Sequence, residues 1–169
     1  MSDITKQSLS ELVKNIKEKK LSSKEVTKAF IDRSEKSKEL NAYISEDYSS
    51  ALEKAKKFDE KPNLDLKLPG IPMAVKDLFC TKNIRTTAGS KILNNFVPTY
   101  ESTVTQNIWN EGAILLGKLN CDEFAMGSSN ETSFFGNVQN PIDKNLVPGG
   151  SSGGSASAVA GQLTPITIG

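Results

Sequence analysis

Two adjacent serines, Ser151 and Ser152, stand between pairs of glycines in residues 148–155, which read PGGSSGGS. Glycine has no Cβ, so this segment can turn sharply and bring its backbone close to a ligand. A run of small residues, 156–160, follows directly and predicts a helix whose first N–H groups would face negative charge above the loop. The pattern predicts a catalytic or anion-binding loop, with a flexible Gly/Ser linker as the alternative.

The loop matches the G-x-S-x-G pattern of a nucleophile elbow around Ser151 and again around Ser152. That mechanism uses a histidine base oriented by a carboxylate, and this chain contains no histidine. Serine chemistry by this chain's own residues therefore needs another base, and a lysine kept neutral by burial is the usual substitute. A phosphate-binding P-loop is not indicated, because no G-x-x-x-x-G-K-[ST] string occurs.

Length and composition limit the class of protein. At 169 residues, with 37% hydrophobic and 24% charged residues, the chain suits one globular domain. Its net charge of +1 creates no overall field that would attract nucleic acid or an anionic membrane. No apolar run reaches the length of a bilayer span and the first residues lack a secretion signal, so we expect a cytoplasmic or organelle-matrix protein. Cys80 and Cys121 are far apart and predict free thiols and no metal site.

Residues 1–61 predict a helical layer. Ser8-x-x-Glu11 and Ser22-x-x-Glu25 are capping boxes, each followed by apolar residues at helical spacing. Residues 41–44 predict a short extended segment, and apolar positions in 48–58 predict a third helix.

Residues 62–169 change to an α/β pattern. The apolar segment before Lys76 predicts a strand, which places this lysine at the strand's carboxyl end, where open α/β sheets bind ligands. An exposed charge is the alternative for one lysine in that place. A helix predicted from Ser102 to Gly112 and a buried strand at 113–117 follow. The segment 166–168 begins another strand, whose unpaired edge predicts that the isolated chain folds poorly or aggregates.

Between these elements, residues 120–127 predict a short helical turn. Asp122 and Glu123 are adjacent and would point in different directions, so we do not interpret them as paired catalytic carboxylates. We expect them to stabilise the positive end of that turn. The polar stretch 128–141 is long enough to predict a functional or disordered loop.

Two segments, GIPMAVKD at 70–77 and PGGSSGGS at 148–155, resemble the catalytic segments of the amidase signature family. The likeness runs from about residue 4 to residue 160. Residues 80–87, 100–104, 122–128 and 135–137 are similar to the branch of the family that works within tRNA-dependent amidotransferases. The resemblance implies an α/β amidase signature fold, with a mixed sheet flanked by helices and an N-terminal helical layer, present here only in part.

The family uses a Ser-Ser-Lys triad. The resemblance implies that Lys76 is the base, kept neutral by desolvation, and that Ser151, preceded by a cis peptide bond, passes a proton from the nucleophile to it. It also places Met126, Gly127 and Ser128 in a loop of the glutamine pocket.

The nucleophilic serine of the family lies in a second glycine-rich string, after the strand that begins at Ile166. We therefore expect this chain to be the N-terminal part of an amidase, with two of the three triad residues and uncertain activity alone. Ser152 and Ser155 are weaker candidates for the nucleophile, because the triad works by geometry.

The amidotransferase branch implies a glutaminase that supplies ammonia for converting Glu-tRNA(Gln) or Asp-tRNA(Asn). Its partners would be the B and C subunits of the amidotransferase, with aminoacyl-tRNA bound by the complex. ATP and Mg²⁺ would bind a partner, and this chain would hold no cofactor. A stand-alone amidase of the same family, and a non-catalytic chain that docks through its N-terminal helices, remain as alternatives.

Overall fold

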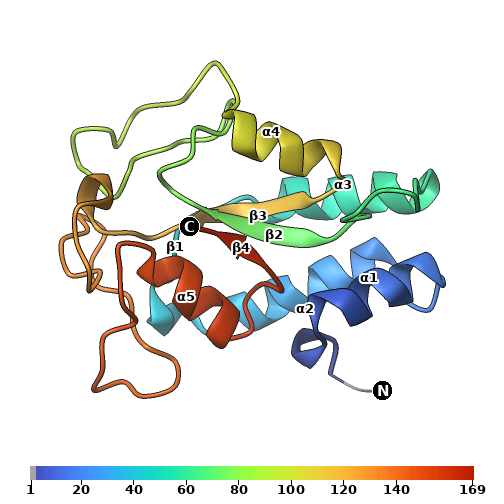
Figure 1. Ribbon diagram of the computed structural model, residues 1–169, viewed down its shortest axis with the longest axis horizontal. Helices are drawn as coiled ribbons and strands as arrows, with labels where there is room; N and C mark the ends of the chain where they lie inside the picture. Colours follow the sequence, from blue (N-terminus) through green and yellow to red (C-terminus); the bar gives the residue numbers. More distant parts are fainter. Residues whose placement is uncertain (1–2) are drawn as a thin grey trace.

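A four-stranded sheet lies at the centre of the computed structural model, which describes residues 3–169 (Figure 1). The strand order is β1-β3-β2-β4; β2 is parallel to β3 and to β4, whereas β1 is antiparallel to β3. The mixed sheet and its helices confirm the predicted α/β fold. The strands are β1 (Tyr43–Glu46), β2 (Pro72–Lys76), β3 (Ile114–Leu119) and β4 (Thr167–Ile168).

Helices cover both faces of the sheet, with α5 on one face and α4 on the opposite one (Figure 1). Three short 3-10 helices connect other segments. The α-helices are α1 (Leu9–Lys17), α2 (Ser23–Glu35), α3 (Tyr48–Glu60), α4 (Thr103–Asn110) and α5 (Gly153–Ala160), and the 3-10 helices are η1 (Ile4–Lys6), η2 (Lys38–Leu40) and η3 (Glu123–Ala125).

The alternation of side chains along β2 decides which way its last residue points. Met73 and Val75 pack in the apolar cluster that includes residues of α4, whereas Ala74 packs with Ala158 of α5. Because successive side chains of a strand point to opposite faces, Lys76 shares the face of Ala74 and is directed toward the α5 side.

Local sequence signals place most elements correctly. Both predicted capping boxes are present: Ser8 and Ser22 each accept from the N–H of the glutamate three residues later, whose side chain bonds back. The buried strand predicted at 113–117 is β3, every residue of which is buried. The helix predicted from residue 156 instead begins at Gly153, because the helical hydrogen bonds extend into the glycine segment.

The helical layer and the sheet share a core. Leu12, Phe30 and Ala55 of the first three helices pack with Ile71 and Leu116 of the sheet region. Strand β1 lies within residues 1–61 and pairs with β3. The domain boundary between residues 61 and 62 stays a prediction.

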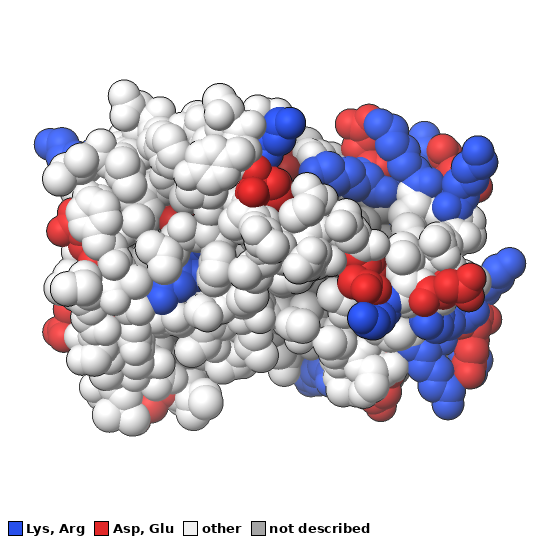
Figure 2. Space-filling model, turned by 45° about the horizontal axis from the view of Figure 1, so that its top comes forward, with Lys and Arg blue, Asp and Glu red and all other residues white. Residues whose placement is uncertain are grey.

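Charge is distributed unevenly over the surface. Figure 2 shows one end of the molecule crowded with charged side chains and the other end largely without them. Most charged residues of the sequence precede residue 68. Many exposed large apolar side chains lie after it, among them Ile92, Tyr100, Met126, Phe134, Ile142 and Leu146. Within the described residues, no helix combines the length and the apolar character that crossing a membrane requires.

We predict that the 169-residue chain self-associates, because β4 has a partner strand on one side only and an open edge can pair with another molecule. Thr167→Lys should weaken the association, since lysine on an edge strand opposes pairing, whereas Ser49→Lys on the surface of α3 should not. Sedimentation velocity over a range of concentrations measures this. A monomer at every concentration would contradict the prediction.

Candidate active site

The side chains of Lys76 and Ser151 meet at the carboxyl end of β2. The side-chain nitrogen of Lys76, Nζ, donates to Ser151 Oγ at 2.7 Å and to Ser152 Oγ at 2.8 Å. The lysine is only 4% exposed. The partners of this buried amine are therefore two hydroxyls, an arrangement through which a proton can move between oxygen and nitrogen.

The serine loop, residues 149–152, leads into α5. The peptide bond between Gly150 and Ser151 is cis, as the family resemblance implies. Ser152 is the N-cap residue of α5, but its side chain makes no capping hydrogen bond, so its hydroxyl is free to accept from Lys76. The Ser151 carbonyl accepts from the N–H of Asp122 at 3.1 Å, which ties the loop to the segment after β3.

Gly150 is required by close packing. A Cβ at this position would collide with Asp122 Oδ2 and would lie 2.8 Å from the carbonyl carbon of Ser128. Only a residue without a side chain allows the serine loop to approach so closely.

The end of β4 lies beside Ser152 and Ser155. Ser155 Oγ donates to the Ile168 carbonyl at 3.4 Å, and a Cβ on Gly169 would stand 2.9 Å from Ser152 Oγ. A segment that follows Gly169, as in a longer protein, would begin next to the Ser152 hydroxyl, which contacts Lys76.

The three residues predicted to bind substrate lie on the surface near the serine loop. Met126, Gly127 and Ser128 are exposed, and Met126 retains 79% of its accessible surface. The α-carbon of Gly127 packs against the carboxyl group of Asp122, and the Ser128 backbone packs against Gly150. The structure thus places the predicted substrate residues next to the loop that carries Ser151. Their role in binding glutamine stays a prediction.

A buried ion pair supports the turn that follows Lys76. Lys118 Nζ lies 3.2 Å from Asp77 Oδ1 and donates to the Phe79 carbonyl and to Thr86 Oγ1, at 2.8 and 2.7 Å. Asp77 Oδ2 accepts from the N–H of Thr87. Burial raises the pKa of Asp77, against the opposing effect of Lys118, and burial lowers the pKa of Lys118.

Because Asp77 forms its ion pair with Lys118, it does not pair with its sequence neighbour Lys76. Our sequence analysis missed Lys118, although a lysine inside the apolar strand 114–119 is a recognisable signal. A charged residue in a buried strand has to find a partner.

Asp122 and Glu123 point to different partners, as predicted, and Glu123 lies in the first turn of η3, but the prediction that Asp122 also stabilises this turn was wrong. Asp122 makes no side-chain hydrogen bond to η3. Its carboxylate instead accepts from the N–H groups of Asn130 and Thr132, because the chain folds back over it. Glu123 accepts from Ser90 Oγ at 2.6 Å and so holds the loop after β2.

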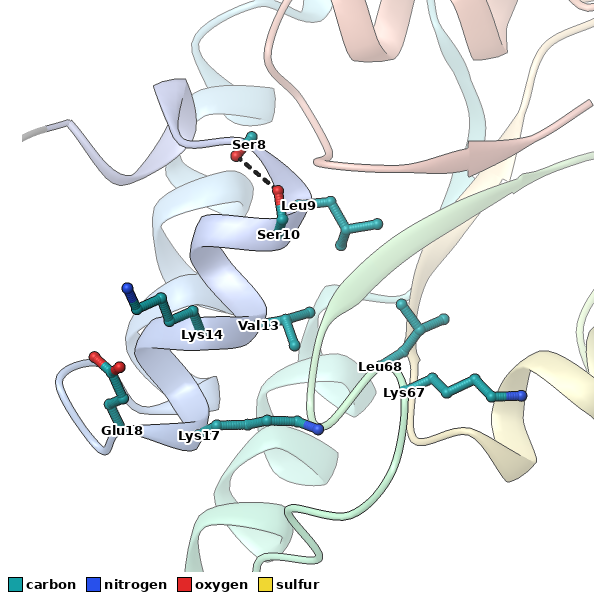
Figure 3. Close-up of a pocket in the computed structure, with 9 residues that line it drawn as sticks. All are labelled: Ser8, Leu9, Ser10, Val13, Lys14, Lys17, Glu18, Lys67 and Leu68. Atoms are coloured by element: carbon teal, nitrogen blue, oxygen red, sulfur yellow. Dashed lines mark hydrogen bonds between the residues drawn. The ribbon is translucent and has the colours of Figure 1, made fainter.

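A groove of about 790 Å³ lies elsewhere, between α1 and the segment before β2 (Figure 3). Figure 3 shows the side chains of Leu9, Val13 and Leu68 directed into it, while Lys14 and Lys67 point away. Its hydroxyl groups belong to Ser8 and Ser10, and Ser8 caps α1. In this groove the two serine hydroxyls contact each other, whereas at Lys76 two serine hydroxyls contact one buried lysine.

Comparison with known proteins identifies the family of the chain. The family profile described as Amidase matches residues 25–169 of the chain. The chain therefore belongs to the amidase signature family. The A subunit of the glutamyl-tRNA(Gln) amidotransferase of Pelagibacter ubique (strain HTCC1062) is 82% identical to it over 169 residues, which are all of this chain and 35% of that protein.

Solved structures show the same fold. The A subunit of the glutamyl-tRNA(Gln) amidotransferase from Thermotoga maritima is 34% identical, with a TM-score of 0.78 over 97% of this chain and 34% of its own. Peptide amidase from Stenotrophomonas maltophilia is 29% identical, with a TM-score of 0.86 over 96% of this chain and 35% of its own. The chain thus spans about a third of the length of these relatives.

We predict that Lys118→Met lowers the free energy of unfolding by about 3–5 kcal/mol, because it leaves Asp77 buried without its cation. The double variant Lys118→Met, Asp77→Asn should recover part of the loss. Urea denaturation at a concentration where the chain is monomeric measures both. A loss below about 1 kcal/mol for the single variant would show that the pair does not hold this region together.

Proposed function

We propose that this chain is the N-terminal part of a glutamine-hydrolysing amidotransferase subunit, in which Lys76 and Ser151 are two of three catalytic residues. The observation that carries the proposal is the contact of the buried Lys76 amine with the Ser151 hydroxyl at 2.7 Å. The family membership and the 82% identity to the A subunit of an amidotransferase support the choice of reaction.

The proposed reaction is acyl transfer through two linked hydroxyls. A serine beyond residue 169 attacks the side-chain amide carbon of glutamine and passes its proton to Ser151 Oγ, while the Ser151 proton moves to neutral Lys76 Nζ. The carbon–nitrogen bond then breaks, and the proton returns along the same path to the leaving ammonia. Water attacks the acyl-enzyme next, releases glutamate and restores the serine.

The position of Gly169 supports this assignment of the nucleophile. Its α-carbon lies against Ser152 and near Ser155, so a following segment starts within reach of the Lys76 network. Effective catalysis by such a relay depends on holding the reacting atoms in place. Ser152, the alternative nucleophile, accepts a hydrogen bond directly from Lys76 Nζ, so its contact with the base does not pass through Ser151.

The remaining steps would belong to other surfaces and other chains. Met126, Gly127 and Ser128, which adjoin the serine loop, would line the glutamine pocket. The ammonia would be used by the B subunit of the amidotransferase, which would bind ATP, Mg²⁺ and aminoacyl-tRNA, and the C subunit would complete the complex. The net charge of +1 on this chain is consistent with tRNA being held mainly by a partner.

A stand-alone amidase is the second candidate, and the structural similarity to peptide amidase favours it. The two functions differ in their need for partners. A completed protein that hydrolyses simple amides at full rate without other subunits would favour the stand-alone enzyme.

The test uses a completed fusion, in which residues 1–169 replace the matching segment of the Pelagibacter ubique protein and are followed by the remainder of that protein. We predict that Lys76→Ala and Ser151→Ala each lower kcat for glutamine hydrolysis at least about a thousandfold, because each interrupts proton transfer to and from the nucleophile. Ammonia release in the presence of the partner subunits is the measurement.

Lys144→Ala, at an exposed lysine, is the matched control and should keep the parental rate. A glutamine-derived electrophile should label the parental fusion through an acyl bond. Full activity of Lys76→Ala would refute the proposed role of this lysine. Stable labelling of the isolated 169-residue chain would place the nucleophile within it.

A further inference from the structure

We propose that Asp122 is a positioning residue that joins the substrate loop, residues 126–132, to the serine loop, residues 149–152. The inference rests on the proposed function, since it concerns the same site. Asp122 lies between β3 and η3, has no exposed surface, and contacts both loops.

The carboxylate holds the substrate loop. Asp122 Oδ2 accepts from the Asn130 N–H at 3.0 Å. Asp122 Oδ1 accepts from the Thr132 N–H at 3.3 Å and from Thr132 Oγ1 at 2.9 Å. The loop therefore folds around one side chain, and the α-carbon of Gly127 packs directly against that carboxyl group.

The backbone N–H and the Oδ2 atom of Asp122 contact the serine loop. The Asp122 N–H donates to the Ser151 carbonyl at 3.1 Å. Asp122 Oδ2 also lies against the α-carbon of Gly150, where a Cβ would collide with it. One residue thus fixes the peptide unit that presents Ser151 and the turn that presents Ser128.

Hydrogen bonding keeps this carboxylate ionised in spite of its burial. Burial by itself raises the pKa of Asp122, but the hydrogen bonds from Thr132, Asn130 and Glu131 outweigh it and hold the pKa below the ordinary value. The negative charge is matched by backbone amides. The Asp122 carboxylate contacts the two loops but not Lys76, whose partners are the hydroxyls of Ser151 and Ser152.

The arrangement has a kinetic consequence. A change at Asp122 shifts the bridging serine and the substrate loop together, so turnover and glutamine affinity should fall in one variant. A displacement of about 1 Å near reacting groups can lower the rate about a hundredfold. A residue that only stabilised the fold would reduce the amount of active enzyme without changing KM.

The experiment measures steady-state glutamine hydrolysis by the completed fusion with its partner subunits. Asp122→Asn keeps the shape but turns one acceptor into a donor facing backbone N–H groups. We expect its kcat/KM to fall about a hundredfold, with a lower kcat and a higher KM. Glu123→Gln, at the neighbouring carboxylate that contacts Ser90, should stay within about twofold of the parent.

A second variant guards against a folding defect in Asp122→Asn. Thr132→Val removes the hydroxyl that bonds to Asp122 Oδ1 and that accepts from the Glu123 N–H, at an exposed position. Because only the substrate loop is loosened, KM should rise several-fold while kcat changes less than about twofold.

The result that overturns the inference is a parental KM in both Asp122→Asn and Thr132→Val, whatever the yield of folded protein. If Asp122→Asn does not fold, the KM of Thr132→Val decides alone. The proposed function is judged separately: a parental fusion that hydrolyses glutamine and a Lys76→Ala variant that does not would support it even when the role of Asp122 fails.

The dependence of stability on pH gives an independent readout. Since the folded-state pKa of Asp122 is lowered, its stabilising effect is present above about pH 4 and is lost as the pH falls through the folded-state value. The urea midpoints of the parent and of Asp122→Asn should therefore converge below about pH 4. A constant difference from pH 3 to pH 7 would contradict the ionised, hydrogen-bonded carboxylate.

Discussion

The structure depends on one contact, between a buried amine at the end of a strand and hydroxyls at the start of a helix. Lys76 is the last residue of β2, and the alternation of that strand turns its side chain toward α5. The serine loop meets it there because Gly150 lets the backbone approach Asp122 and Ser128. Removing the amine from bulk water is costly, so the surrounding structure has to supply its partners.

Two buried carboxylates, those of Asp77 and Asp122, lie near this contact but bond to other groups. Asp77 follows Lys76 directly, but it forms its ion pair with Lys118. Asp122 lies under the serine loop, but its oxygens accept from the amides of Asn130 and Thr132. A carboxylate beside the amine would favour its charged form and oppose its use as a base. The charged groups that stabilise the fold, Asp77 with Lys118 and Asp122, therefore have partners other than Lys76, the group proposed to accept a proton.

Sequence reasoning found the residues with local signals and missed those with distant partners. The capping boxes, the strand before Lys76 and the buried strand predicted at 113–117 follow from short patterns, and the structure contains them, the last as β3. The partners of Asp122 and Lys118 depend on how loops fold back, which no local pattern records, although the lysine inside an apolar strand is itself a signal that a partner exists. Helix α5 begins earlier than predicted because its glycines pack against other segments, which offsets their low helix propensity.

The position of one nitrogen atom, Lys76 Nζ, decides whether this site can move a proton, and a crystal structure of the protein at high resolution measures that position most directly. We predict Lys76 Nζ within about 3 Å of the hydroxyl oxygens of both Ser151 and Ser152, the usual length of such hydrogen bonds. A Lys76 side chain that extends into solvent, or that pairs with Asp77 or Asp122, would contradict the proposed role of this lysine.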